Sequence, residues 1–166
     1  MRFLIMLIPI ICFGKDELAR AKQLHSKAIG ADSHIETLQW VINQKADLGK
    51  RHDVYHVDIP RLFEGGMRNP YFAMYVPTYY SGPEAIRKIL RLRDAMQRVL
   101  DGYPSQIDLA LNASDVERIQ KAGKIAAVLT IESGHAIADD LAVLRMYHRL
   151  GVRSMTLIQP GSGDVE

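Results

Sequence analysis

The chain has 166 residues, of which 48% are hydrophobic and 24% charged, and its formal net charge is +2. This is the profile of one globular domain that can bury a core. The charges are distributed along the sequence, and the densest basic stretch, residues 87–98, has the spacing of the solvent side of an amphipathic helix. The composition therefore argues against a nucleic-acid-binding protein, in which a basic stripe with interleaved aromatic residues is expected.

The N-terminal segment predicts export. Residues 1–14 place one positive charge before a short apolar run and end in small residues, which is the layout of a secretory signal peptide cleaved after Gly14. The mature chain, 15–166, then has no cysteine, so any metal must be held by histidine and carboxylates. The predicted location is periplasmic, extracellular or membrane-associated.

Two alternatives for this segment stay open. One is an uncleaved membrane anchor, although the apolar run is shorter than the ~20 residues that cross a bilayer. The other is a lipid-modified Cys12, which the bulky Ile11 before it disfavours.

The rest of the chain alternates between helix-like and strand-like patterns, and a glycine ends or directly follows each predicted helix. We expect helices at residues 15–29, 36–48, 83–102, 114–122 and 139–150, the fourth opened by a capping box at residues 114–117. Strands are expected at residues 31–34, 71–76, 125–131 and 152–158, and residues 50–68 are expected to form a polar connection. The run 125–131 has no polar alternation, which is typical of a strand covered on both faces.

Strands that alternate with helices predict a parallel α/β sheet. No strand is followed by a Gly-x-Gly-x-x-Gly or P-loop sequence, so a nucleotide-binding doubly wound fold loses its main support. A (β/α)8 barrel needs at least ~200 residues. The sequence therefore predicts an incomplete TIM-like (β/α)8 barrel, about its first half, with four parallel strands and intervening helices.

Polar, metal-competent side chains follow the predicted strands, at the rim where parallel barrels build their active sites. They are Asp32, His34 and Glu36 where the first strand ends, Glu132 where the third ends and Gln159 where the fourth ends. His34 and Glu36 are two residues apart, so in an extended segment they point to the same face and can share one ion, for which zinc is suited. From spacing alone, a solvated pair at the rim remains an alternative.

Glu132 is the stronger signal because a charge at the end of a buried apolar strand costs free energy unless it is paired. Its alternatives are a helix cap or an ion pair with an arginine. We expect His25, His52 and His148 to lie on the surface. His56 and His135 sit beside turns, where an imidazole that hydrogen-bonds backbone is commoner than a ligand, and both are left unassigned. The aromatic group Tyr71, Phe72, Tyr75, Tyr79 and Tyr80 is explained equally well by a substrate pocket and by packing between strand and helix.

Four ordered segments between residue 30 and the C-terminus form one recognisable pattern. They are Asp-Ser-His-Ile-Glu-Thr at 32–37, residues 56–77, Ile-Glu-Ser-Gly-His-Ala-Ile at 131–137 and residues 144–157. Together they resemble the membrane (renal) dipeptidase family, the M19 zinc metallopeptidases. The first is similar to the Asp-x-His-x-Asp segment of the family's first strand, the second to its second-strand region and the third to its Val/Ile-Glu-Gly-Gly-His-x-Ile signature.

The resemblance implies a TIM-like barrel with two zinc ions that hydrolyses dipeptides by a metal-activated water. Carried over by position, His34 and Glu36 would hold the first zinc, and Glu132 would bridge both ions as the catalytic carboxylate. Gln159 stands where the family usually has a substrate-contacting histidine.

Three departures from the family pattern bear on this interpretation. Glu36 replaces an aspartate, which adds one methylene to a metal ligand. Gln159 cannot titrate. The remaining two zinc-ligating histidines of the family, and its later substrate-binding arginine and aspartate, lie beyond Glu166.

We therefore expect a zinc-dependent dipeptidase that acts as part of a longer or complemented chain, with a missing C-terminal half or a homo-oligomer as partner. The alternatives are an inactive truncated remnant and a metal-dependent amidohydrolase-like enzyme with another substrate.

Overall fold

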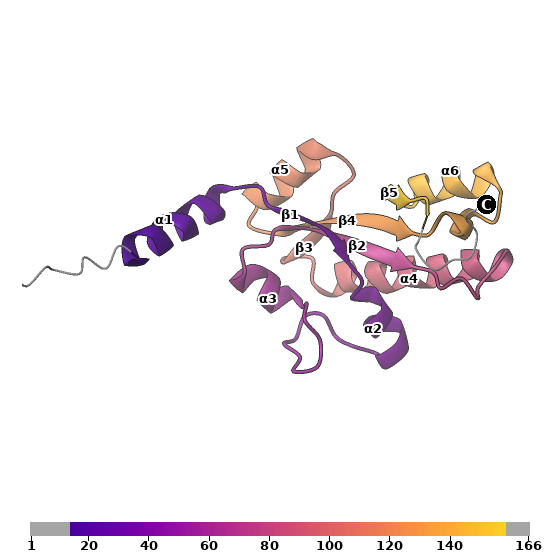
Figure 1. Ribbon diagram of the computed structural model, residues 1–166, viewed down its shortest axis with the longest axis horizontal. Helices are drawn as coiled ribbons and strands as arrows, with labels where there is room; N and C mark the ends of the chain where they lie inside the picture. Colours follow the sequence, from indigo (N-terminus) through magenta and orange to yellow (C-terminus); the bar gives the residue numbers. More distant parts are fainter. Residues whose placement is uncertain (1–13, 159–166) are drawn as a thin grey trace, which may run out of the picture.

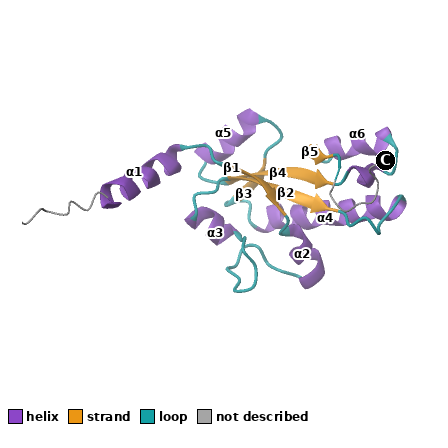
Figure 2. Ribbon diagram, viewed as in Figure 1, coloured by secondary structure: helices purple, strands orange, loops and turns teal. Residues whose placement is uncertain are grey.

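The computed structural model describes residues 14–158 as a parallel β-sheet with helices on both of its faces (Figures 1 and 2). The strands are β1 (Ala31–Ile35), β2 (Asn69–Tyr75), β3 (Ile107–Leu109), β4 (Ile125–Glu132) and β5 (Val152–Thr156). The helices are α1 (Gly14–Lys27), α2 (Leu38–Gln44), α3 (Ile59–Glu64), α4 (Pro83–Gly102), α5 (Ala113–Lys121), the 3-10 helix η1 (Gly134–Ile137) and α6 (Leu141–Arg149). The predicted signal peptide lies outside the described residues, apart from Gly14.

The strand order identifies the kind of α/β fold. Across the sheet, β1 lies beside β2, β2 beside β4 and β4 beside β5, and every pair is parallel. These four strands therefore occur in the sheet in the same order as in the sequence. The short β3 pairs with the first part of β4. A sheet that follows the chain without reversing is the arrangement of a barrel, whereas a doubly wound sheet reverses at its switch point. The predicted fold class is confirmed: the four expected strands are present, and β3 adds a fifth.

The two faces of the sheet are covered differently. Phe72 and Leu129 belong to the large core that α2 and α4 cover. Because side chains alternate along a strand, Tyr71 and Val128 point to the opposite face, where they pack with α5. We call this second face, which carries Asn69, Tyr71, Val128, Thr130 and Glu132, the inner face.

Helix α1 projects away from the sheet and its covering helices (Figure 1). Its contact with the rest of the structure includes a hydrogen bond between the His25 imidazole Nε2 and the Gly65 carbonyl, at 2.8 Å.

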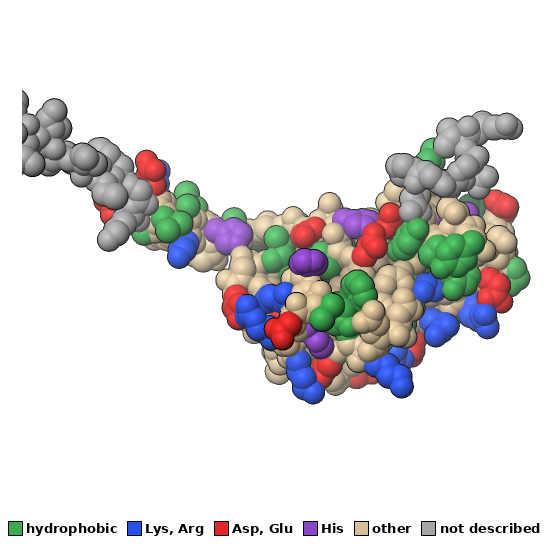
Figure 3. Space-filling view, turned by 60° about the horizontal axis from the view of Figure 1, so that its bottom comes forward, with side chains coloured by type: hydrophobic (Ala, Val, Ile, Leu, Met, Phe, Trp, Pro, Cys, Tyr) green, Lys and Arg blue, Asp and Glu red, His purple; other side chains and the backbone are tan. Residues whose placement is uncertain are grey.

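On the face shown in Figure 3, basic and acidic side chains are interspersed. Among residues 14–158, no helix combines the length and the hydropathy that a membrane crossing would require.

The structure corrects three local expectations. The second helix is shorter than residues 36–48, because Lys45 takes a left-handed conformation, with φ of 54°, directly after α2. Residues 50–68 contain the helix α3, which Asp58 caps and which has proline in its first turn. Helix α5 is capped by Asn112, whose side chain accepts from the Asp115 backbone N–H, and not by Ser114.

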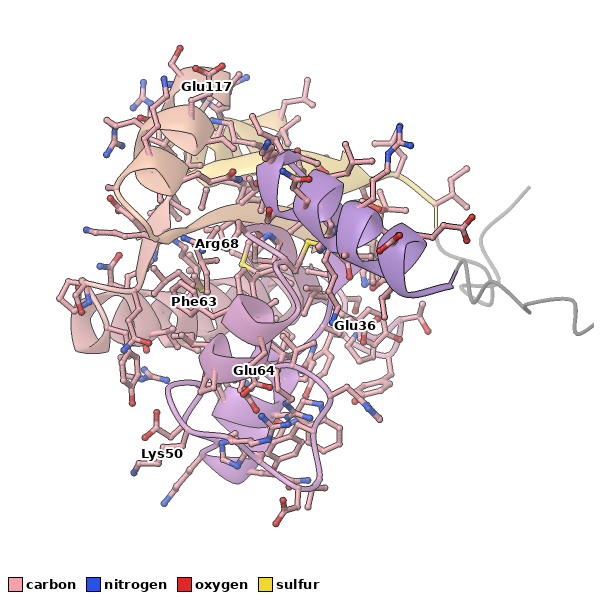
Figure 4. The ribbon with its side chains drawn as sticks, turned by 90° about the vertical axis from the view of Figure 1, so that its left-hand side faces the viewer. Glu36, Lys50, Phe63, Glu64, Arg68 and Glu117 are labelled. Carbon is pink, nitrogen blue, oxygen red and sulfur yellow. The ribbon has the colours of Figure 1, made fainter. Side chains whose placement is uncertain are left out.

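Asp58 holds together the connection between α2 and β2. Its carboxylate is fully buried and accepts from the Arg61 backbone N–H at 2.9 Å, the Arg61 Nε at 2.8 Å and the His52 backbone N–H at 3.2 Å. Burial raises the pKa of Asp58, but these hydrogen bonds outweigh it, so that the net pKa lies below the ordinary value. Further along, the Arg68 guanidinium lies 4.6 Å from the centre of the Phe63 ring (Figure 4).

Replacing Asp58 is expected to destabilise the fold. Asp58→Ala removes the cap of α3 and leaves the Arg61 guanidinium, which is 24% exposed, without its carboxylate; we expect a loss of ~3 kcal/mol in the free energy of unfolding at pH 7. Because the folded-state pKa is lowered, this contribution is complete above the unfolded pKa of ~3.9 and disappears as the pH falls through the folded value.

Urea unfolding of the wild type and Asp58→Ala between pH 7 and the acid range measures both effects. The exposed Asp53 of the same connection provides the control, since Asp53→Ala should change stability by less than ~0.5 kcal/mol. A difference between wild type and Asp58→Ala that grows toward acid pH would contradict the assignment.

Candidate metal centre

One imidazole and two carboxylates meet at the carboxyl ends of β1 and β4. The Nε2 atom of His34 lies 3.1 Å from Oε1 of Glu36 and 3.1 Å from Oε2 of Glu132. The three potential ligand atoms lie within 4.8 Å of one another, and no other group of three His, Cys, Asp or Glu residues in the part of the chain described here comes as close. The structure therefore brings together the three metal ligands expected from the sequence, while Gln159 lies outside the described residues.

The pairing of the strands explains why residues so far apart in the chain meet. Tyr75 at the end of β2 is level with Glu132 at the end of β4. On the other side of β2, strand β1 contains a β-bulge between Asp32 and Ile35. Along this stretch, three residue steps on β1 lie beside two residue steps on β2. Such a bulge re-aims a side chain at a strand end, and here Ile35 is buried in the core while His34 is 44% exposed at the rim.

Two hydrogen bonds hold the segment around His34 in place. The carboxylate of Asp32 accepts from the His34 backbone N–H at 3.0 Å, so Asp32 supports the bulge and is not part of the close group. After β1, the Gln39 side chain donates to the Tyr75 carbonyl at 2.8 Å, which ties α2 to the end of β2. Glu36, labelled in Figure 4, reaches the imidazole in spite of its extra methylene.

The electrostatic environment of the two carboxylates differs. The Glu36 side chain is 46% exposed, whereas that of Glu132 is only 16% exposed. The imidazole is hydrogen-bonded to Glu36, and the buried Oε2 of Glu132 is close to the same nitrogen without a hydrogen bond of ordinary geometry. Burial raises the pKa of Glu132, the Glu36 carboxylate raises it further, and His34 offsets only part of this.

The backbone directly after Glu132 is strained. Ser133 is buried and has a φ of 107°, in a region that favours glycine. Gly134 follows, and a Cβ atom there would lie 2.4 Å from the Leu157 carbonyl oxygen, so the chain allows no side chain at this position. Strain of this kind persists where the surrounding structure enforces it, and it is common beside functional groups.

The other expected site residues have separate roles. Phe72 packs in the core and Tyr79 is largely exposed, whereas Tyr71 lies on the inner face with Glu132. A cavity of about 230 Å³ adjoins His34 and Glu36 and is also lined by His56 and Trp40. The sequence left His56 unassigned, because an imidazole beside a turn more often hydrogen-bonds backbone than binds a ligand, and no sequence pattern singled out Trp40.

The chain is similar to known metallopeptidases over most of its length. A family model described as membrane dipeptidase (peptidase family M19) matches residues 18–162. "Dipeptidase ataJ" of Aspergillus terreus (strain NIH 2624 / FGSC A1156) is 36% identical over 108 residues, which cover 60% of this chain and 26% of the relative.

Two solved structures share the fold. The probable dipeptidase PvdM from Pseudomonas aeruginosa superposes with a TM-score of 0.78 at 19% identity, covering 89% of this chain and 39% of that one. A metallopeptidase from Rhodobacter sphaeroides, liganded with a phosphinate mimic of the dipeptide L-Ala-D-Ala, superposes with a TM-score of 0.68 at 22% identity, covering 75% and 44%. The chain spans about a quarter of the length of several curated relatives that it matches.

The strain at Ser133 leads to a prediction that compares two variants. Ser133→Ala and Ser133→Gly both remove the hydroxyl that donates to the Val76 carbonyl, but only glycine also removes the Cβ atom. We therefore expect Ser133→Gly to unfold at higher urea than Ser133→Ala, by ~1 kcal/mol in the free energy of unfolding. Equal stability of the two variants, or a more stable alanine variant, would show that the backbone at Ser133 is not strained.

Proposed function

The chain belongs to the membrane dipeptidase family, peptidase family M19, and from this premise we propose that it forms part of a zinc-dependent dipeptidase whose metal ligands include His34, Glu36 and Glu132. The single observation that carries the proposal is the convergence of these side chains at the rim of the sheet, within 4.8 Å of one another.

The residues fit a divalent metal of the zinc type. An imidazole nitrogen and carboxylate oxygens are ligands that zinc takes in proteins. The buried Oε2 of Glu132, which has no hydrogen bond of ordinary geometry, is an oxygen that a cation would satisfy. For zinc to bind, the His34 Nε2 must present its lone pair, so the ring proton must reside on Nδ1.

The chemistry supplied by zinc when bound is polarisation of a carbonyl group and activation of a water molecule. The chain's own residues set the conditions for it. Glu132 is shielded at the end of β4, where low exposure strengthens its interactions with neighbouring charges. The Asp32 hydrogen bond to the His34 backbone restrains the imidazole toward the carboxylates.

Dipeptides are the substrate class that we propose. Support comes from family membership, from the name of the relative in Aspergillus terreus, and from the dipeptide mimic bound to the structural neighbour from Rhodobacter sphaeroides. We also propose that residues 1–14 direct export, on the basis of their sequence pattern alone.

A closed barrel has more strands than residues 14–158 form. The chain provides three ligand side chains, from one side of a barrel mouth. We propose that the remaining strands, and the ligands of a second zinc ion, come from a further stretch of polypeptide or from a second copy of the chain.

Zinc binding tests the ligand assignment directly. The chain is expected to bind one zinc ion per copy in a competition titration with a chromogenic chelator. His34→Ala and Glu132→Gln should each weaken the affinity at least ~10-fold, or ~1.4 kcal/mol. His148→Ala, an exposed histidine of α6, provides the control and should leave the affinity unchanged.

The pH dependence of zinc binding adds an independent criterion. Because the pKa of Glu132 is raised, a proton competes with the metal at a pH above the ordinary range of glutamic acid, and the affinity should decline as the pH falls through that raised value. Zinc affinity that is the same in Glu132→Gln and the wild type would remove Glu132 from the site.

Hydrolysis of L-Ala-D-Ala tests the proposed activity. Free alanine, measured by chromatography over a range of zinc and protein concentrations, should appear once the barrel is completed, and Glu132→Gln should abolish it while His148→Ala does not. Zinc binding without alanine release at any protein concentration would favour the inactive remnant over the dipeptidase.

A further inference from the structure

A small cavity lies beside the metal centre, between the β1–α2 segment and the connection from α2 to α3 (Figure 1). Its volume is about 230 Å³, and its walls include His34 and Glu36 on one side and His56 and Val57 on the other. This volume is below the ~300–1,000 Å³ of pockets that enclose drug-sized ligands. The cavity therefore has room for one residue of a dipeptide next to the metal, and not for the whole molecule.

Contacts between the two walls hold the cavity in shape. The hydroxyl of Thr37, which is 5% exposed, donates to the Val57 carbonyl at 3.4 Å. Trp40 also lines the cavity, and its ring packs against that of Tyr55 with the centroids 4.8 Å apart. The Tyr55 hydroxyl in turn donates to the Gln44 side chain at the end of α2, at 2.7 Å. Trp40 is therefore a flat wall whose orientation is set by its contact with Tyr55.

The polar groups of the cavity are only partly used within the chain. Asp32 lines the cavity, and its Oδ1 accepts from the His34 backbone N–H, while its Oδ2 has no partner among residues 14–158. The exposed imidazole of His56 likewise makes no hydrogen bond to any described residue. An imidazole carries an N–H donor in either tautomer, whereas a carboxylate only accepts. The cavity thus presents an unused acceptor at Asp32 and an unused donor at His56.

These walls fit a side-chain amide better than the other side chains of a dipeptide. An amide has N–H donors for Asp32 and an oxygen acceptor for His56, and its flat face can pack against Trp40. A carboxylate would be repelled by Asp32 and Glu36, and an ammonium accepts no hydrogen bond from His56. An apolar side chain would cover both polar groups without pairing them, which is unfavourable. A hydroxyl can donate and accept, but it has no flat face to lie on the indole.

We propose that His56 is a substrate-binding residue, and that this cavity takes the side-chain amide of an asparagine or glutamine residue of the dipeptide. The assignment rests on the proposed dipeptidase function and specifies a substrate preference within it. The His56 N–H donates to the amide oxygen, the amide N–H groups donate to Asp32, and the amide plane lies on the Trp40 ring. His56 is not a member of the close group of metal ligands, so it binds substrate without binding the metal.

The fluorescence of Trp40 reports whether the cavity is occupied, because this is the only tryptophan of the chain. The full chain, loaded with zinc, is titrated with L-Gln-L-Ala and L-Ala-L-Gln. L-Met-L-Ala and L-Ala-L-Met are the matched ligands of similar side-chain length without an amide, and all readings are taken at once after mixing. We expect one of the glutamine dipeptides to bind at least ~10-fold more tightly than its methionine counterpart.

Variants of His56 assign this preference to its side chain. His56→Ala should bring the affinities for the glutamine and methionine dipeptides within ~2-fold of each other, while the zinc affinity stays that of the wild type. His56→Asn, whose amide can donate a hydrogen bond, should restore part of the preference. His148→Ala, on the exposed side of α6 and outside the cavity, is the control and should change neither affinity.

Equal affinities of the wild type for glutamine and methionine dipeptides, or a preference that survives His56→Ala, would overturn the proposal. A loss of zinc affinity in His56→Ala would overturn it as well, because His56 would then be a metal ligand. Zinc affinity is measured separately from dipeptide binding. Absence of zinc binding therefore contradicts the proposed function itself, whereas zinc binding without an amide preference contradicts the role of His56 alone.

Discussion

The candidate metal centre depends on the parallel pairing of β2 with β4, because this pairing brings the end of β4, with Glu132, to the rim where β1 presents His34. Tyr71 to Tyr75 run level with Val128 to Glu132 along the sheet. The apolar residues of these strands alternate between the large core under α2 and α4 and the smaller one under α5. Since both strands end at the same edge, Glu132 emerges from a buried strand at the rim, within reach of the imidazole that β1 provides from the other side of β2.

The close approach of the Glu36 and Glu132 carboxylates is unfavourable in free energy, and His34 counteracts part of this. Burial and the nearby Glu36 carboxylate raise the pKa of Glu132, and the strained Ser133 follows directly. His34 alone offsets part of the repulsion between the carboxylates. A divalent cation would offset more of it, so the features that destabilise the chain by itself are those that favour a metal at this position.

The sequence predicted the elements whose pattern is long and repeated. The uninterrupted apolar run of β4 and the regular apolar spacing of α4 specify their structures. The places of His34, Glu36 and Glu132 at strand ends, together with the resemblance to a metallopeptidase family, indicated all three residues of the close group. Helix α3 was missed although Asp58 and Pro60 are a start signal, because the residues around it are polar and its six residues are too few for a visible period. Strand β3 has only three residues, and its pairing with β4 is a long-range contact that no local pattern encodes. The bulge that aims His34 likewise depends on the register with β2, which only the folded sheet defines.

We propose that one cation binds to the His34 imidazole and the carboxylates of Glu36 and Glu132 at the ends of β1 and β4. The most direct test is a crystal structure of the chain grown with zinc, with an anomalous difference map calculated at the zinc absorption edge. We expect a single strong peak per rim at ~2.0–2.2 Å from His34 Nε2 and from an oxygen of Glu132, with Glu36 also in the coordination sphere. A peak held by other residues, or His34 and Glu132 turned away from each other with no peak between them, would contradict it.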